Sequence, residues 1–160
     1  MSQVEEHLKW CLKDSRRLTK AKPDIDLAMK HISKSEYNYK VLQDMEGLKY
    51  DDWALNAGFY AIYHCFLAIL AKYGYESRNQ SCTITVLLTL IDEGRLDLDK
   101  DIVMQFDTLD SEKNLLSPTI RDSRETSTYG VETSIDQEQL KRIKDMILMV
   151  QRETIRIVRT

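Results

Sequence analysis

The stretch that decides the fold is AGFYAIYHCFLAILA, residues 57–71, in which His64 is the one plainly polar residue. Its 15 residues are fewer than the roughly 20 that a helix needs to cross a bilayer, and charged or amide residues flank it closely. A helix that is apolar on all sides belongs at the centre of a core or against a partner. We therefore expect a central helix that starts at residue 51 or 52, ends near residue 73 and is stopped by Gly74.

The composition of the whole chain supports a helical fold. Only five Gly and two Pro occur in 160 residues, whereas sheet-rich folds need many turns and turns need these two residue types. With 42% hydrophobic and 31% charged residues, the chain has the composition of one ordinary globular domain, residues 1–160. The net charge of −3 excludes a strongly basic nucleic-acid binder by composition alone.

Apolar residues also recur at helical spacing on both sides of this stretch. The expected helices cover residues 2–21, residues 25–45, a segment around Thr83–Val86 that ends at Gly94, a segment that starts near Asp99, and a segment that starts at Ser134. The last start rests on Ser134-x-x-Gln137, which is a capping-box pattern. Residues 75–79 are expected to be a polar loop, and residues 121–134 a helix end that runs into a loop. The fold class is therefore all-α, a single up-and-down bundle of five or six helices.

The cysteines and histidines are scattered along the chain, at Cys11, Cys65, Cys82, His7, His31 and His64. Without a CxxC pair or a ligand-like spacing, the sequence predicts neither a disulfide framework nor a metal site, and it implies no cofactor. We expect Cys65 and Cys82 to be inert buried thiols. The N-terminus, MSQVEEHLKW, has no apolar signal region, and isolated cysteines are typical of a reducing cytoplasm, so we expect a cytoplasmic protein with no membrane contact.

A family resemblance rests on the central helix and on a later polar stretch. The helix pattern is carried by Phe59, Tyr60, Ala61, Tyr63, His64, Leu67, Ala68, Leu70 and Gly74. It resembles the long second core helix of HEPN-superfamily domains, and the similarity extends over roughly residues 5–155. The resemblance implies a small helical bundle that forms a homodimer. It also implies a protein that often pairs with a minimal nucleotidyltransferase in a toxin–antitoxin module, and in many cases a metal-independent RNase.

The polar stretch RDSRETSTYG resembles the signature of that family in two registers. In one, Arg121 is followed by the polar Asp122, and Tyr129 stands two positions after Ser127, which occupies the place of the family's His. In the other, the stretch starts at Arg124 and ends at Tyr129 and Gly130. The His is absent in both registers, and the family's loop signal at residues 79–82 is altered as well. If a partner nucleotidyltransferase exists, the resemblance makes Tyr129 a candidate for nucleotidylation.

The chemistry of RNA cleavage explains why this stretch is the best candidate site. Cleavage without a metal needs a base with a pKa near 7 and cations for the phosphorane charge. Arg121 and Arg124 could supply the cations and, with Asp122 and Ser127, contact RNA or a nucleotide, while a dimer would join two such pairs in one cleft. Tyr129 is a poor base at a pKa of about 10. Whether the protein is an enzyme is left open.

Other interpretations of the same residues also stand. The two arginines are ordinary features of a helix C-terminus, where they complement the helix dipole, and His64 is an ordinary hydrogen-bonded core residue. The domain could be a non-catalytic interaction module that docks a nucleotidyltransferase or another partner. It could also be an unrelated four-helix scaffold, in which Arg121 and Arg124 would diverge into solvent. We expect a homodimer, because the central helix has more apolar surface than one bundle easily covers.

Overall fold

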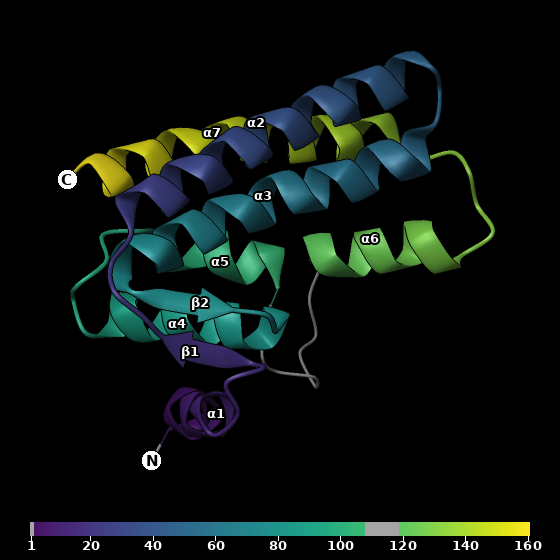
Figure 1. The fold of residues 1–160 in the computed structure, drawn as a ribbon. Coiled ribbons are helices and arrows are strands. Elements are labelled where there is room, and N and C mark those ends of the chain that lie inside the picture. Colours follow the sequence, from purple (N-terminus) through teal and green to yellow (C-terminus); the bar gives the residue numbers. More distant parts are fainter. Residues whose placement is uncertain (1, 108–118) are drawn as a thin grey trace.

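The computed structural model describes residues 2–107 and 119–160, and in these residues the protein is almost entirely helical (Figure 1). The helices are α1 Gln3–Leu12, α2 Ile25–Gly47, α3 Asp51–Tyr73, α4 Gln80–Asp92, α5 Lys100–Phe106, α6 Ile120–Tyr129 and α7 Gln137–Arg159. Two short strands, β1 Leu18–Lys20 and β2 Tyr75–Ser77, form the only sheet of the described residues. The all-α prediction is confirmed, with seven described helices where five or six were expected.

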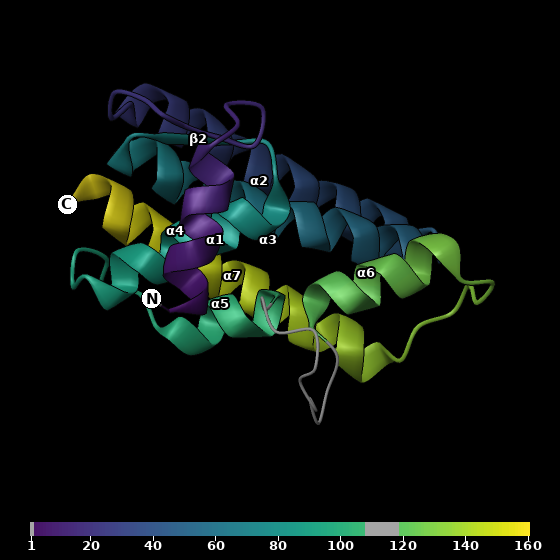
Figure 2. The same cartoon turned by 90° about the horizontal axis from the view of Figure 1, so that it is seen from below.

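The central position of α3 is confirmed. It packs against α2, α4, α6, α7 and β2, and most of its apolar side chains are buried, including the ring of Phe59. In Figures 1 and 2, α2 and α7 run lengthwise beside it. Neighbours within the same chain therefore cover most of the helix, and the large rings that it leaves exposed are those of Trp53 and Tyr60. By length and composition alone α3 could cross a membrane, but 72% of its most apolar window is buried inside the fold.

Two glycines explain how closely α3 meets its neighbours. A Cβ atom at Gly58 would lie 3.0 Å from side-chain atoms of both Leu42 in α2 and Ile143 in α7, so the absence of a side chain allows the three helices to approach closely. Gly74 ends α3 in the left-handed conformation, at φ 85°, as the sequence predicts. A side chain is excluded there because its Cβ would lie 2.6 Å from the carbonyl oxygen of Ala21.

The N-terminal region differs from the prediction of one helix over residues 2–21. The helix ends at Leu12, and β1 pairs antiparallel with β2, so that Leu18 lies opposite Ser77. Residues 75–77, expected to be loop, form the second strand of this pair. The physical reason has a local and a long-range part. Locally, Asp14 accepts a hydrogen bond from the backbone N–H of Arg16 and starts a turn. At long range, β1 pairs with a distant segment, and such pairing leaves no trace in local periodicity.

A second difference is covalent, because Cys11 and Cys82 form a disulfide between α1 and α4. The prediction of no disulfide framework, with Cys82 an inert thiol, is therefore wrong. The two residues are 71 positions apart in the sequence, and only the fold brings them together. Cys65 is a free, buried cysteine as expected, and burial raises the pKa of its thiol to about 11.

Two further boundaries move in the second half of the chain. The polar stretch after residue 119, predicted to be a helix end and loop, is the helix α6, so Arg121 lies near a helix N-terminus rather than a C-terminus. In addition, α7 is capped by the Asp136 side chain instead of starting at Ser134. The helical prediction for Thr83–Val86 is confirmed, and α5 starts at Lys100 with Asp99 as its cap, close to the expected position. The apolar spacing also predicts that Leu109, Leu115 and Leu116 pack against the core and that Pro118 kinks the helix or opens a new one, and these residues lie outside the described part of the chain.

Candidate functional site

Helix α6 is stabilised at its N-terminus by two reciprocal hydrogen bonds between Thr119 and Asp122. The Thr119 hydroxyl accepts a hydrogen bond from the backbone N–H of Asp122, and the Asp122 carboxylate accepts one from the backbone N–H of Thr119. This reciprocal capping box satisfies N–H groups that have no partner within a helix. Ile120 and Ser123 face inward and are buried. Asp122, predicted to contact RNA or a nucleotide, therefore holds the helix start instead of pointing at a neighbouring arginine.

Arg121 joins α6 to the end of α5 through a buried carboxylate. Its Nη1 lies 3.3 Å from Oδ2 of Asp107, whose side chain is only 3% exposed, and its Nε lies 3.2 Å from Oε1 of Glu125. Gln80 also donates to the same Asp107 oxygen, at 3.1 Å. The Arg121 side chain itself is 41% exposed. The Arg121 guanidinium group therefore binds protein carboxylates, while part of the side chain is open to solvent.

Arg124 lies on the aromatic surface of α3. Its guanidinium carbon is 4.5 Å from the ring centroid of Phe59 and 6.0 Å from that of Tyr60, which is cation–π geometry. Its Nη2 lies 3.9 Å from Oε1 of Glu125. The Nε atom is buried and has no hydrogen-bond partner among the described residues. The two guanidinium groups therefore converge on one carboxylate oxygen, which contradicts the scaffold interpretation, in which they diverge into solvent.

The remaining predicted residues lie at other places on α6. Tyr129 is the last residue of the helix and is 80% exposed. It follows Arg121 by eight positions of helix, about 12 Å along the axis. Ser127 instead lines a cavity of about 270 Å³ between α6, the following loop and the start of α7. Within one chain, then, the fold brings Arg121 and Arg124 together but sets Ser127 and Tyr129 apart from them.

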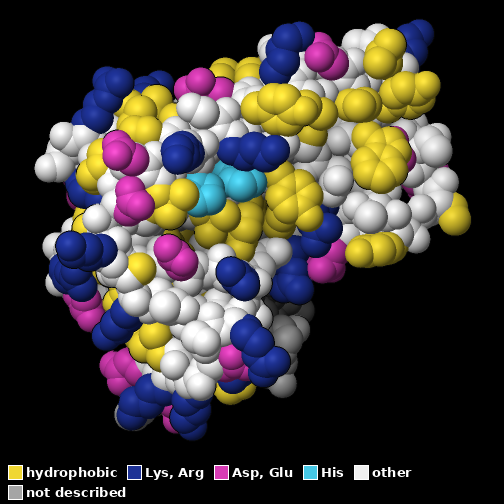
Figure 3. All heavy atoms as spheres, in the orientation of Figure 1, with side chains coloured by type: hydrophobic (Ala, Val, Ile, Leu, Met, Phe, Trp, Pro, Cys, Tyr) yellow, Lys and Arg dark blue, Asp and Glu magenta, His cyan; other side chains and the backbone are white. Residues whose placement is uncertain are grey.

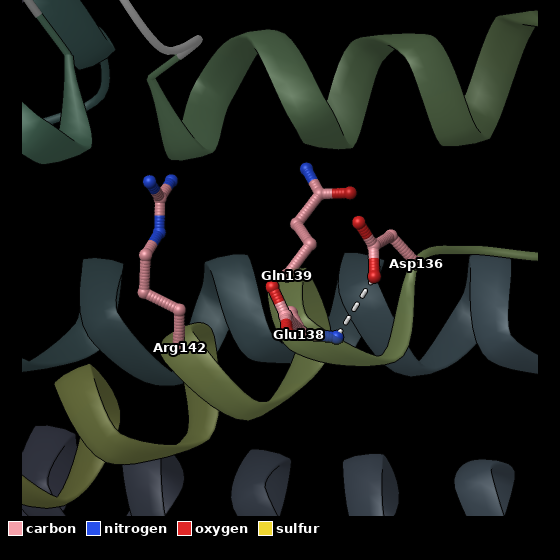
Figure 4. Close-up of a pocket in the computed structure, with 4 residues that line it drawn as sticks. All are labelled: Asp136, Glu138, Gln139 and Arg142. Carbon is pink, nitrogen blue, oxygen red and sulfur yellow. Dashed lines mark hydrogen bonds between the residues drawn. The ribbon is translucent and has the colours of Figure 1, made fainter.

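A neighbouring hollow belongs to α7. It has a volume of about 420 Å³ and is lined by Asp136, Glu138, Gln139 and Arg142. Figure 4 shows the Gln139 and Arg142 side chains rising from α7 toward α6, and Gln139 donates a hydrogen bond to Ser123 at 2.6 Å. Because two carboxylates border the hollow, its charge is mixed, and it is a weaker anion site than the arginine pair.

Two histidines predicted to stand apart are in direct contact. Nδ1 of His31 in α2 lies 3.0 Å from Nδ1 of His64 in α3, and Figure 3 shows histidine side chains meeting at the surface beside hydrophobic groups. Such a bond needs one protonated and one unprotonated nitrogen. Burial, and then the charges of His31 and Lys34, lower the pKa of His64 to about 4, and burial also lowers the pKa of His31.

The histidine pair is close to the arginine site along α3. His64 follows Tyr60 by four residues, so the two side chains share one face of the helix, and the guanidinium carbon of Arg124 lies 6.0 Å from the Tyr60 ring centroid. Sequence reasoning missed Asp107, Phe59 and this histidine pair as parts of the site. The i,i+4 spacing of Arg121 and Glu125 was the one available signal for an ion pair.

No protein-family model matches the chain, and the search of curated proteins finds no match.

Proposed function

We propose that the protein is a HEPN-type domain of a toxin–antitoxin or related defence module that binds RNA or a nucleotide on the face shared by α3 and α6. The observation that carries this is the convergence of Arg121 and Arg124 on Oε1 of Glu125, at 3.2 and 3.9 Å. Two guanidinium groups around one exposed carboxylate form a position that a phosphate can take over, because arginine binds both anions in the same way. The half-exposed Tyr60 ring beside them offers a stacking surface for a base.

The same proposal includes a homodimer and a cytoplasmic location, in which the Cys11–Cys82 disulfide would be open to reduction because the cytoplasm keeps thiols reduced. A second copy that faces α6 would double the number of guanidinium groups around one bound strand, which raises affinity for a polyanion. The covered surface of α3 no longer supplies a reason for dimerisation. The support comes instead from the family resemblance and from the rings that remain exposed on this side, Trp53, Tyr60 and Tyr129.

Binding of a labelled single-stranded RNA or tRNA, measured in EDTA at low salt, tests the proposal. We expect Arg121→Ala and Arg124→Ala each to weaken binding about tenfold, since each removes a charge-assisted contact to phosphate. Glu125→Gln should strengthen binding, because it removes the anion that competes for the site. Arg156→Ala is the matched control, since Arg156 is 43% exposed and ion-paired with Glu153 on α7.

The outcomes separate the interpretations. Unchanged binding in both arginine variants, or weaker binding in Glu125→Gln, would overturn the phosphate site and leave the arginines as structural ion pairs. Cleavage of the RNA in the same EDTA assays would add a second function. The His31–His64 pair would supply the imidazole for this step, but a pKa of about 4 makes His64 a weaker base than the value near 7 that the reaction needs. His64→Asn would then abolish cleavage but leave RNA binding intact.

The non-catalytic alternative has its own support at the end of α6. Tyr129 and Val131 are the most exposed large hydrophobic side chains of the described residues, at 80% and 92%, and exposed aromatic groups are typical of binding surfaces. A minimal nucleotidyltransferase that docks there could reach the Tyr129 hydroxyl. Mass spectrometry of the co-expressed pair checks this, and an unmodified Tyr129 peptide would count against nucleotidylation.

A further inference from the structure

The disulfide between α1 and α4 lies next to a histidine that could join it in binding a metal. His7 and Cys11 are four residues apart and so share one face of α1, and Cys82 lies in the first turn of α4. One potential ligand atom from each of the three residues lies within 4.8 Å of the others. His7 is only partly buried, whereas both cysteines are fully buried. The two sulfur atoms therefore lie inside the protein, while solvent can approach the cluster past the partly exposed His7 side chain.

The orientation of His7 is already set by groups outside the cluster. Its Nε2 lies 2.9 Å from the Ser81 hydroxyl oxygen, and that hydroxyl donates to Oδ1 of Asn79 at 2.8 Å. Because the serine proton is used in the second bond, Nε2 of His7 is the donor in the first. The lone pair is thus left on Nδ1. Metal-binding histidines commonly have this arrangement, with one ring nitrogen donating to a second group that orients the ring.

We propose that, when the disulfide is reduced, His7, Cys11 and Cys82 bind one Zn²⁺ ion, and that oxidation to the disulfide releases it. Two thiolates and one imidazole, with water in the fourth position, form a recognised tetrahedral zinc donor set. Zn–S and Zn–N distances of about 2.3 and 2.0 Å place the ligand atoms roughly 3.5–3.8 Å apart. The potential ligand atoms already lie within 4.8 Å of one another, so binding the ion requires only a small rearrangement.

The redox step balances with hydrogen peroxide as oxidant. The two zinc-bound thiolates lose two electrons and form the sulfur–sulfur bond, while Zn²⁺ leaves without a change in its own oxidation state. Peroxide takes up the two electrons with two protons and becomes two molecules of water. In the reverse direction a dithiol reductant transfers two electrons to the disulfide, and Zn²⁺ displaces the protons of the resulting thiols.

The consequence is that α1 stays attached to α4 in both redox states. Besides the disulfide, the main contacts of α1 within the described residues are with α4 and β1. Cys11 is the one fully buried residue of α1. Zinc would replace one cross-link by another between the same two helices. The junction of α1 and α4 thus acts as a zinc site that responds to oxidant.

Metal titration of the full chain tests the proposal. The chain is reduced with a phosphine, desalted without oxygen and titrated with Co²⁺, whose thiolate complexes show a charge-transfer absorption. We expect one Co²⁺ per reduced chain, displaced by one equivalent of Zn²⁺, and no such absorption from the oxidised chain. His7→Gln should weaken binding at least tenfold, whereas Cys65→Ser, which removes the buried cysteine outside the cluster, should change nothing.

The release step is measured on the zinc-loaded chain. Added peroxide should release one Zn²⁺ to a chelating dye for each disulfide formed. The proposal is overturned if the reduced chain binds Co²⁺ no better than Cys82→Ser, or if His7→Gln binds it as tightly as the unchanged chain. It also fails if the disulfide resists the phosphine until the protein unfolds. Because His7→Gln keeps both cysteines, it tests the site even if Cys82→Ser does not fold, and binding at the His31–His64 pair would lack the thiolate absorption.

Discussion

Helices α1 and α6 have the same length, 10 residues each. They lie in different parts of the molecule (Figures 1 and 2), and different interactions attach them to the rest of the fold. Each helix has few fully buried residues, Cys11 in α1 and Ile120 and Ser123 in α6, although Val4, Leu8 and Leu12 of α1 also pack against the core. A disulfide holds α1 to α4, whereas ion pairs and a cation–π contact hold α6 to α5 and α3. We therefore expect the attachment of α1 to depend on redox conditions and that of α6 to depend on charge.

Removal of the disulfide should have the largest effect. The bond closes a loop across a sequence separation of 71, and the chain-entropy model assigns about 4 kcal/mol of stability to a loop of this size. We expect the double variant Cys11→Ala, Cys82→Ala to lose about this much free energy of unfolding, measured by urea denaturation with EDTA present.

The buried free cysteine provides the control for this measurement. Cys65→Ala removes a thiol of the same size but no cross-link. A loss below about 1 kcal/mol in the double variant would mean that packing and the two-stranded sheet hold α1 without the covalent bond, and the contrast with α6 would disappear.

Arg121→Ala should have an intermediate effect on α6. It leaves the Asp107 carboxylate, 3% exposed, without the nearby Arg121 cation. Breaking a fully buried pair costs 3–5 kcal/mol, and because Arg121 is partly in water we expect about 2 kcal/mol. Urea denaturation of Arg121→Ala, Asp107→Asn and the double variant measures the coupling between the two side chains.

A coupling energy near zero would contradict this account, since it would show that the α5–α6 junction does not depend on the pair. Arg124→Ala is an informative comparison, because it removes the contact with Phe59 and Tyr60 and should cost about 1 kcal/mol.

The smallest expected effect concerns the hydrogen bond between the neutral side chains of His31 and His64, which lies in neither α1 nor α6. The pKa of His64 is lowered from 6.5 to about 4, so between these values the unfolded chain binds more protons than the folded one. This part of the stability is fully present above pH 6.5 and is lost as the pH falls toward 4. Water screens the partly buried ring, so we expect a loss on the order of 1 kcal/mol.

Urea denaturation at several pH values checks this, with His64→Gln as the comparison. The variant should show a flatter decline between pH 6.5 and 4, because it has no imidazole to protonate at this position. An identical pH dependence in both proteins would show that other groups are responsible.

Much of the helical framework could be predicted from local pattern. The boundaries of α3, its left-handed end at Gly74 and the buried side of α7 follow from the spacing of apolar residues and from one glycine. In contrast, the polar residues 121–129 have too few apolar positions to show a helical period, so α6 was missed. Its helical state depends on the capping box at Thr119 and on its packing against α3.

The candidate sites show the same division. The sequence by itself identified Arg121 and Arg124 as charges on one stretch, and it determined that an all-α chain would be built around residues 57–71. Only the tertiary structure decided that Glu125, Asp107 and the Phe59 ring surround these arginines, that His31 meets His64, and that Cys11 meets Cys82. The physical reason is range. Periodicity and capping act between residues a few positions apart, whereas these contacts join residues that only the packing of helices brings together.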